Sequence, residues 1–158
     1  MTPAINALKR AKIDYQLHHY EHDAQSTSFG EEAASKLAIE PSAMYKTLIA
    51  CDEHNPKQMV VAVVPVAGHL DLKKLAKAAG MKKMKMADPS QAEKTTGYIK
   101  GGISPLGQKK SLPTFVDSSA ADRCEIFVSG GKRGLTLQLA PRPLVALVRG
   151  QFAPIASD

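Results

Sequence analysis

A glycine-rich, basic segment in the second half of the chain has the residue types of an anion- or carbonyl-binding site. Residues 101–110 read Gly-Gly-Ile-Ser-Pro-Leu-Gly-Gln-Lys-Lys, and Lys100 precedes them. Glycines permit a close approach of the backbone, so several N–H groups around the Ser-Pro step can converge on one oxygen-rich ligand. The lysines at the entry and exit would attract phosphate. An ordinary surface loop is the alternative, although loops of this length in compact domains are often functional.

The same segment has part of the spacing of a nucleotide-binding P-loop. Gly102 and Gly107 stand at the positions of the two glycines of that motif. Gln108, however, occupies the position at which the motif requires a lysine that reaches the nucleotide phosphates. We therefore exclude nucleotide triphosphate hydrolysis.

A lysine inside an apolar strand pattern is the second candidate. Lys46 lies within residues 44–50, and strand alternation places it on one face with Leu48 and Ala50. If that face is directed inward, the ammonium enters a partly apolar pocket, where it acts either as a base or as a donor to an anionic or carbonyl oxygen. The alternative is a lysine whose charged end reaches solvent from the end of the strand.

A tight, glycine-rich turn is the third candidate. Residues 129–134 combine a serine hydroxyl, three glycines and two cations, Lys132 and Arg133. Consecutive backbone N–H groups in such a turn can form an anion-binding nest. Glycine hairpins without any ligand are also common, so the pattern alone leaves both interpretations open.

The sequence offers no convincing metal-ligand set and no recognisable nucleophile motif. His18 and His22 share a face of an expected strand, but no cysteine or glutamate stands at ligand spacing from them. Cys51 and Cys124 lack a redox or protease signature, so buried, inert thiols are expected. A nucleophile-elbow motif is also missing. We therefore expect no metal site.

Short helices must position these residues, and capping signals predict where they lie. Thr2 and Pro3 are typical of a helix start, and Ser28 with Glu31 matches a capping box. In all, helices are expected at residues 3–13, 28–37, 71–80, 89–96 and 141–149.

Strand patterns alternate irregularly with these helices. Strands are expected at residues 15–20, 45–51, 59–66, 84–86, 114–117, 125–129 and 135–139. The second and third form a hairpin, and the tail after Phe152 is expected to fray. The fold class is therefore α/β (mixed), with residues 1–158 in a single domain. We expect a curled mixed β-sheet or partial barrel flanked by helices.

Composition sets the class of protein. The 158 residues carry a formal net charge of +6, which favours a polyanionic partner such as nucleic acid, although a merely soluble basic protein has the same balance. Two cysteines are too few for a disulfide framework, which indicates a reducing compartment. The longest apolar run, residues 59–67, contains Pro65 and is far shorter than a membrane span. A cytoplasmic protein is expected.

Six segments together resemble the YbaK family of aminoacyl-tRNA editing proteins, which is related to the editing domain of bacterial prolyl-tRNA synthetases. The segments are residues 2–5, 29–34, 45–48, 96–99, 101–110 and 128–135. The resemblance implies a free-standing deacylase that clears Cys from Cys-tRNA(Pro), with Cys-tRNA(Cys) as a further candidate substrate. It implies no metal and no organic cofactor. Transient partners would be tRNA and prolyl-tRNA synthetase, and neither DNA nor a membrane is expected.

The resemblance also distributes roles over the three candidate features. The family's invariant lysine falls on Lys46 and its glycine-loop backbone on Gly101 and Gly102, which form the expected catalytic set. The expected substrate-binding set is Tyr20, Phe29, Thr47, Ile103, Ser104, Pro105, Ser129 and Gly130. The expected contacts to tRNA phosphates are Lys100, Lys109, Lys110, Lys132 and Arg133.

The missing nucleophile leads to a hypothesis about the reaction. A cysteinyl ester carries a thiol three bonds from its carbonyl carbon, so that thiol can attack the ester, expel the ribose oxygen and give a cysteine thiolactone. The protein then needs only to orient the substrate and stabilise the oxyanion through the N–H groups of Gly101 and Gly102, while Lys46 holds the ester or the terminal ribose-phosphate. Two alternatives stay open. One is hydrolysis of Ala-tRNA(Pro) by a positioned water, and the other is a non-catalytic module that binds tRNA or a synthetase.

Overall fold

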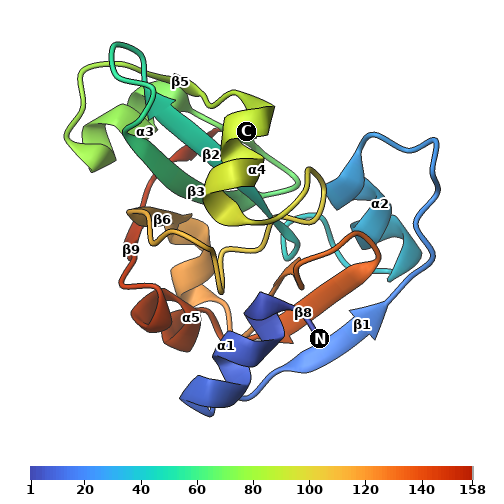
Figure 1. The fold of residues 1–158 in the computed structure, drawn as a ribbon. Coiled ribbons are helices and arrows are strands. Elements are labelled where there is room, and N and C mark those ends of the chain that lie inside the picture. The colour runs from blue at the N-terminus through green and yellow to red at the C-terminus, as the bar shows by residue number, and fades with distance from the viewer. Residues whose placement is uncertain (158) are drawn as a thin grey trace.

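The computed structural model describes residues 1–157 (Figure 1). The helices are α1 Pro3–Ala11, α2 Phe29–Lys36, α3 Leu72–Ala79, α4 Pro89–Thr96 and α5 Pro141–Leu147, with a short 3-10 helix η1 at Ser118–Asp122. The strands are β1 Gln16–His19, β2 Tyr45–Asp52, β3 Met59–Pro65, β4 His69–Leu70, β5 Met84–Met86, β6 Thr114–Asp117, β7 Ile126–Ser129, β8 Leu135–Leu139, β9 Gln151–Ala153 and β10 Ala156–Ser157. None of the helices in this part of the chain combines the length and apolarity needed to cross a membrane.

The strands form three sheets. The largest has the order β5-β2-β3-β6-β9, and β1-β8-β7 and β10-β4 form the others. Because β3 pairs antiparallel with β2 and parallel with β6, the largest sheet is mixed. A parallel bridge between Met44 and Phe127 joins the start of β2 to β7, and the Phe127 N–H donates to the Ala43 carbonyl at 3.0 Å. The expected mixed α/β class is confirmed, and across residues 1–157 the sheets do not close into a barrel.

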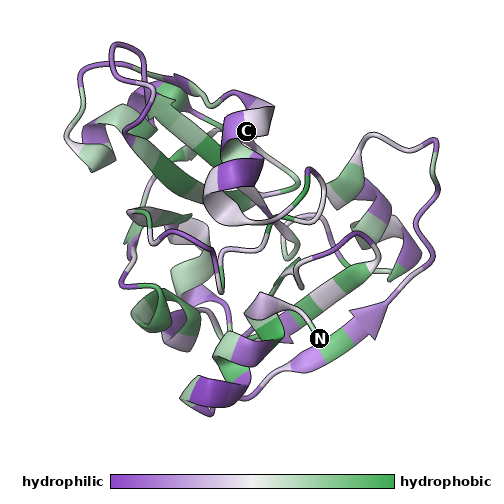
Figure 2. Cartoon of the chain, viewed as in Figure 1, coloured by the Kyte–Doolittle hydropathy of each residue, from purple (hydrophilic) through white to green (hydrophobic). Residues whose placement is uncertain are grey.

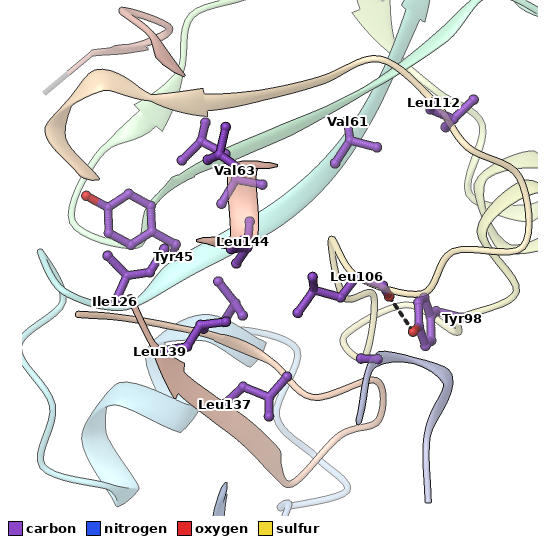
Figure 3. Packing of buried hydrophobic residues seen from close by; sticks show 14 of the residues in the cluster. Tyr45, Val61, Val63, Tyr98, Leu106, Leu112, Ile126, Leu137, Leu139 and Leu144 are labelled. Atoms are coloured by element: carbon purple, nitrogen blue, oxygen red, sulfur yellow. Dashed lines mark hydrogen bonds between the residues drawn. The ribbon is translucent and has the colours of Figure 1, made fainter. Parts of the chain in front are cut away.

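β3 contributes core side chains to both faces of the largest sheet. Val61 and Val63 pack into a cluster shared with α1, α5, β7 and β8 (Figure 3). Val60 and Val64 face the opposite side, where they pack with Leu75 of α3. Burial on both faces explains why β3 has a continuous apolar run instead of an alternating one. In Figure 2, β2 and β3 are accordingly hydrophobic over most of their length.

The predicted helix caps form at α1 and α3 but not at α2. The Thr2 hydroxyl accepts from the Ile5 N–H, and Gly80 ends α3 in the left-handed conformation. Ser28 precedes α2 with φ −99° and ψ 72°, outside the extended region that directs a capping hydroxyl at the helix, and its side chain makes no cap hydrogen bond. The expected capping box of Ser28 and Glu31 is therefore wrong, although α2 begins where it was expected.

The end of the chain differs most from expectation. The tail was expected to fray after Phe152, but β9 pairs parallel with β6, and β10 pairs with β4. The Asp117 carboxylate accepts the N–H groups of Ile155 and Ala156, both at 3.0 Å, and Ile155 is fully buried. Helix α5 ends at Leu147, earlier than expected, and Arg149 turns the chain with φ 54°.

Candidate active site

A pocket of about 420 Å³ lies between β2, the start of α2, the loop after α4 and the turn from β7 to β8. Its walls include many of the residues expected at the site: Tyr20, Phe29, Lys46, Thr47, Lys100, Gly101, Ile103, Ser129 and Lys132. The three features singled out in the sequence therefore meet at one cavity. Figure 1 shows the elements that surround it, with α2 and β8 on one side and β2 with α4 on the other.

Lys46 is a half-buried cation in the wall formed by β2. It pairs with Val64 of β3 in the ladder, and a Cβ added at Gly30 of α2 would lie 3.9 Å from the Lys46 Cβ. The ion pairs within residues 1–157 join other residues, so the Lys46 ammonium is available to an anionic or carbonyl oxygen. Leu48 follows on the same face and also lines the pocket, so the surroundings of Lys46 are partly apolar.

Thr47 presents polar atoms without partners to the same cavity. Within residues 1–157 its Oγ1 is the one buried side-chain oxygen or nitrogen that has no hydrogen-bond partner. Every second residue of β2 makes its backbone hydrogen bonds with β3. The Asp52 N–H, for example, donates to the Gln58 carbonyl at 3.0 Å. Thr47 therefore directs its own N–H and C=O to the other edge, and β5 covers that edge only along residues 50–52. A buried polar group of this kind is costly unless a ligand satisfies it.

The first turn of the glycine loop gives Gly101 and Gly102 different surroundings. The Gly102 N–H donates to the Ile99 carbonyl at 2.9 Å, and Gly101 has φ 85°, which is the geometry of a type II turn. Gly102 is buried against the backbone of Lys132 and does not line the pocket. Its N–H is thus occupied, and the structure contradicts its expected role as an oxyanion donor. Gly101 lines the pocket, and among residues 1–157 its N–H has no acceptor.

The Ser-Pro part of the loop is packed into the protein. Ser104 is fully buried, its Oγ accepts the Leu106 N–H at 3.3 Å, and its carbonyl accepts the Gln108 amide at 3.0 Å. The buried Tyr98 hydroxyl donates to the Leu106 carbonyl at 2.6 Å (Figure 3), and burial raises the pKa of Tyr98 to about 12. Ser104 and the equally buried Pro105 hold the loop in place and lie outside the pocket lining.

The basic residues occupy two different places. The N–H groups of Lys109 and Lys110 donate to the last carbonyls of α4, at 2.8 and 3.1 Å, and their side chains are exposed away from the pocket lining. Lys100 and Lys132 stand at the pocket. Arg133 lies beside it, with its guanidinium carbon 4.7 Å from the centroid of the Phe29 ring.

The turn from β7 to β8 uses most of its polar groups internally. The Ser129 Oγ accepts the Gly131 N–H at 3.2 Å, and the Gly130 N–H donates to the Leu135 carbonyl at 2.8 Å. The Gly130 carbonyl accepts from the Thr2 hydroxyl, and Gly130 is buried. This turn therefore fixes the wall, with Ser129 and Lys132 as its pocket residues, and Gly130 lies outside the lining.

A polar cluster at the entrance to α2 was missed in the sequence. The Glu32 carboxylate accepts from the Asp23 N–H and from His22 Nδ1, both at 2.7 Å, and lies 3.1 Å from the Lys36 ammonium. Burial works to raise the pKa of Glu32, but the hydrogen bonds outweigh it and lower that pKa to about 2. The His22 ring lies 5.7 Å from Phe29, so the cluster supports the pocket wall. Of these contacts, the sequence indicates only the one between Glu32 and Lys36, which stand four residues apart in a helix.

The two cysteines and Tyr20 are poorly suited to act as a protein nucleophile. Cys51 is buried, and burial raises the pKa of its thiol, whereas Cys124 is exposed away from the pocket. Burial also raises the pKa of Tyr20, which keeps its hydroxyl neutral. No group of three His, Cys, Asp or Glu residues within 1–157 is arranged to hold a metal ion. The site can orient a substrate and stabilise negative charge.

Comparisons with known proteins also point to an aminoacyl-tRNA editing protein. Residues 22–147 match the family described as the aminoacyl-tRNA editing domain. The chain is 41% identical over 156 residues to an Enterococcus faecalis protein named "Putative Cys-tRNA(Pro)/Cys-tRNA(Cys) deacylase EbsC", and the match covers 99% of this chain and 93% of the relative.

Two solved structures share the fold. One, described as "a putative trans-editing enzyme for prolyl tRNA synthetase", has a TM-score of 0.80 at 23% identity and covers 99% of this chain and 96% of its own. The other, a hypothetical protein, has a TM-score of 0.85 at 24% identity and covers 98% and 99%. The family match over residues 22–147 and the 41% identical relative show that the chain belongs to the aminoacyl-tRNA editing domain family.

Proposed function

We propose that this protein is a trans-editing deacylase that removes Cys from Cys-tRNA(Pro), with Cys-tRNA(Cys) as a second substrate. The observation that carries the proposal is the meeting of Lys46 and the Gly101 N–H in one pocket of an editing-family fold, where Lys46 has no ion-pair partner and the Gly101 N–H no acceptor among residues 1–157. The name of the 41% identical relative supports the choice of aminoacyl group and tRNA.

The reaction we propose uses the nucleophile that the substrate brings. The cysteinyl sulfur attacks the ester carbonyl carbon and forms the C–S bond of a thiolactone. The bond from that carbon to the ribose oxygen then breaks, and the oxygen leaves as the tRNA hydroxyl after receiving the thiol proton. The atoms balance without a water molecule, and the thiolactone hydrolyses later in solution.

The protein's part in this reaction is to position the ester and stabilise its charge. The Gly101 N–H donates to the developing oxyanion, and Lys46 holds the ester or the terminal ribose-phosphate. The unpartnered Thr47 atoms contribute polar contacts to the aminoacyl group. Cys51 is buried outside the pocket lining and burial raises the pKa of its thiol, which supports an attacking group that arrives with the substrate.

The rest of the tRNA lies outside the pocket. In the proposal, Lys100 and Lys132, which line the pocket, contact the phosphates nearest the ester, and the exposed Lys109 and Lys110 contact phosphates farther away. Discrimination among tRNAs would come from prolyl-tRNA synthetase as a transient partner in the cytoplasm. All residues 1–158 belong to this single editing domain in the proposal.

A comparison of substrates tests the proposal. Purified protein is incubated with Cys-tRNA(Pro), Ala-tRNA(Pro) and Ser-tRNA(Pro), and loss of the aminoacyl ester is followed. We expect rapid loss of Cys alone, because only the cysteinyl ester has the thiol. Equal turnover of all three would refute thiol attack and favour a positioned water, and no turnover of any would favour a non-catalytic binding module.

A Lys46→Ala variant tests the assignment of the lysine. Loss of its contact with the substrate should reduce turnover of Cys-tRNA(Pro) by about 100-fold. Full activity in this variant would remove Lys46 from the site. Far-UV circular dichroism is the control for folding. The half-buried Lys46 side chain makes no ion pair with the other described residues, so we expect the variant to fold normally.

A further inference from the structure

The peptide group between Lys100 and Gly101 is the central peptide of the type II turn that begins the glycine loop. In a trans peptide the C=O and N–H point in opposite directions, so the direction of the Lys100 carbonyl fixes that of the Gly101 N–H. Type I and type II turns differ by a flip of this peptide. A glycine after it accepts both, because it is stable at negative and positive φ. The turn sequence by itself therefore leaves the direction of the Gly101 N–H undecided.

Arg133 supplies the missing constraint from another part of the chain. Its Nε–H donates to the Lys100 carbonyl at 2.8 Å. Its guanidinium also lies over the Phe29 ring, which is flanked by His22. The planar guanidinium is held by the ring as well as by the carbonyl, and Arg suits such a double contact better than Lys does.

The backbone N–H of Lys100 is held in place as well. The Lys100 N–H donates to Glu93 Oε2 of α4 at 2.9 Å. Arg133 is not among the residues that line the pocket, whereas Gly101 is. A carbonyl directed at Arg133 therefore leaves the opposite N–H pointing away from Arg133.

We propose that Arg133 is a positioning residue that holds the Lys100–Gly101 peptide in the orientation that presents the Gly101 N–H to the pocket. A cation on the carbonyl also withdraws electron density from the peptide and makes its N–H a stronger donor. The inference rests on the proposed function, in which Gly101 stabilises the oxyanion. It replaces the expectation that Arg133 contacts a tRNA phosphate.

The test measures steady-state deacylation of Cys-tRNA(Pro) by Arg133→Gln and Arg133→Lys. We expect kcat to fall by about 10-fold or more in both, below the roughly 10²–10³-fold expected for complete loss of an oxyanion donor, with KM nearly unchanged. Arg142→Gln is the matched control, because Arg142 also lies over a ring, that of Phe152, and donates to a backbone carbonyl, that of Ala121. This control should keep full activity.

A phosphate contact would give a different result. Arg133→Lys would then restore KM because the charge is kept, and Arg133→Gln would raise KM and reduce the salt dependence of binding. That outcome, or an unchanged kcat in both variants, would overturn the proposal.

An amide spectrum separates this inference from the proposed function. In ¹⁵N-labelled protein, Arg133→Gln should shift the Gly101 amide resonance, while Arg142→Gln should not. An unshifted Gly101 resonance would refute the positioning role even if the enzyme were active. A shifted resonance in a protein that deacylates no aminoacyl-tRNA would uphold the structural constraint and reject the function.

Discussion

Replacing Gly101 with alanine tests the packing of the pocket wall most directly. A Cβ at this position would lie 2.6 Å from Phe29 Cδ1 and 2.7 Å from its Cγ. The ring cannot easily yield, because Arg133 and His22 flank it. Gly101 also has φ 85°, a conformation that disfavours alanine.

The expected loss of stability has two parts that a control separates. The left-handed backbone costs an alanine about 1–2 kcal/mol, and forcing a methyl group against the ring costs about 1–3 kcal/mol more. Gly101→Ala should therefore lower the free energy of unfolding by about 2–5 kcal/mol. Gly80→Ala is the matched control: its φ is 71°, but a Cβ there would meet nothing within 4 Å, so only the backbone part applies.

Urea unfolding followed by far-UV circular dichroism measures both variants, since the chain has no tryptophan. Turnover of Cys-tRNA(Pro) by the folded fraction of Gly101→Ala should fall by about 100-fold, because the turn that presents the N–H must shift. Gly80→Ala should retain turnover. Equal destabilisation of the two variants would refute the contact with Phe29, and normal turnover by Gly101→Ala would refute the role of this turn.

Three further substitutions probe neighbouring features. Thr47→Val removes a buried hydroxyl that has no hydrogen-bond partner among the described residues, so the free energy of unfolding should rise by about 1 kcal/mol while turnover falls; a loss of stability in urea would contradict this assignment. Tyr98→Phe leaves the Leu106 carbonyl without its donor and should destabilise the fold by about 1–2 kcal/mol, seen as a lower urea midpoint. The third concerns pH. Because the pKa of Glu32 is lowered from 4.5 to about 2, its stabilising effect is present above about pH 4.5 and is lost as the pH falls toward 2. Glu32→Gln should therefore be less stable than the wild type at pH 7, and the difference should shrink between pH 4.5 and 2; a constant difference would contradict the pKa shift.

Local signals explain why so much of the scaffold could be predicted. The start of α1 at Thr2 and the end of α3 at Gly80 depend on residues next to one another in sequence. The hairpin of β2 and β3 likewise has apolar strands on both sides of one polar turn. By contrast, β4 and β10 are two residues long, and they form because they pair with each other across most of the chain. A pattern that short carries no periodicity to detect.

The site was predictable as a set of segments but not atom by atom. A glycine permits close approach of any group, and sequence does not say which group approaches. At Gly102 it is the backbone of Lys132, and at Gly107 it is the backbone of Pro3, so neither glycine serves a ligand. Of the three glycines in residues 101–110, only Gly101, beside Phe29, lies at the cavity. The contact of His22 with Glu32 was equally invisible, because it depends on how a ten-residue connection folds back.

The pocket walls come from several separated stretches of chain, from Tyr20 near one end to Thr136 near the other. No helix or hairpin alone contains the lysine, the glycine turn and the aromatic wall together. A partly unfolded chain that has not brought these segments together therefore lacks the assembled pocket.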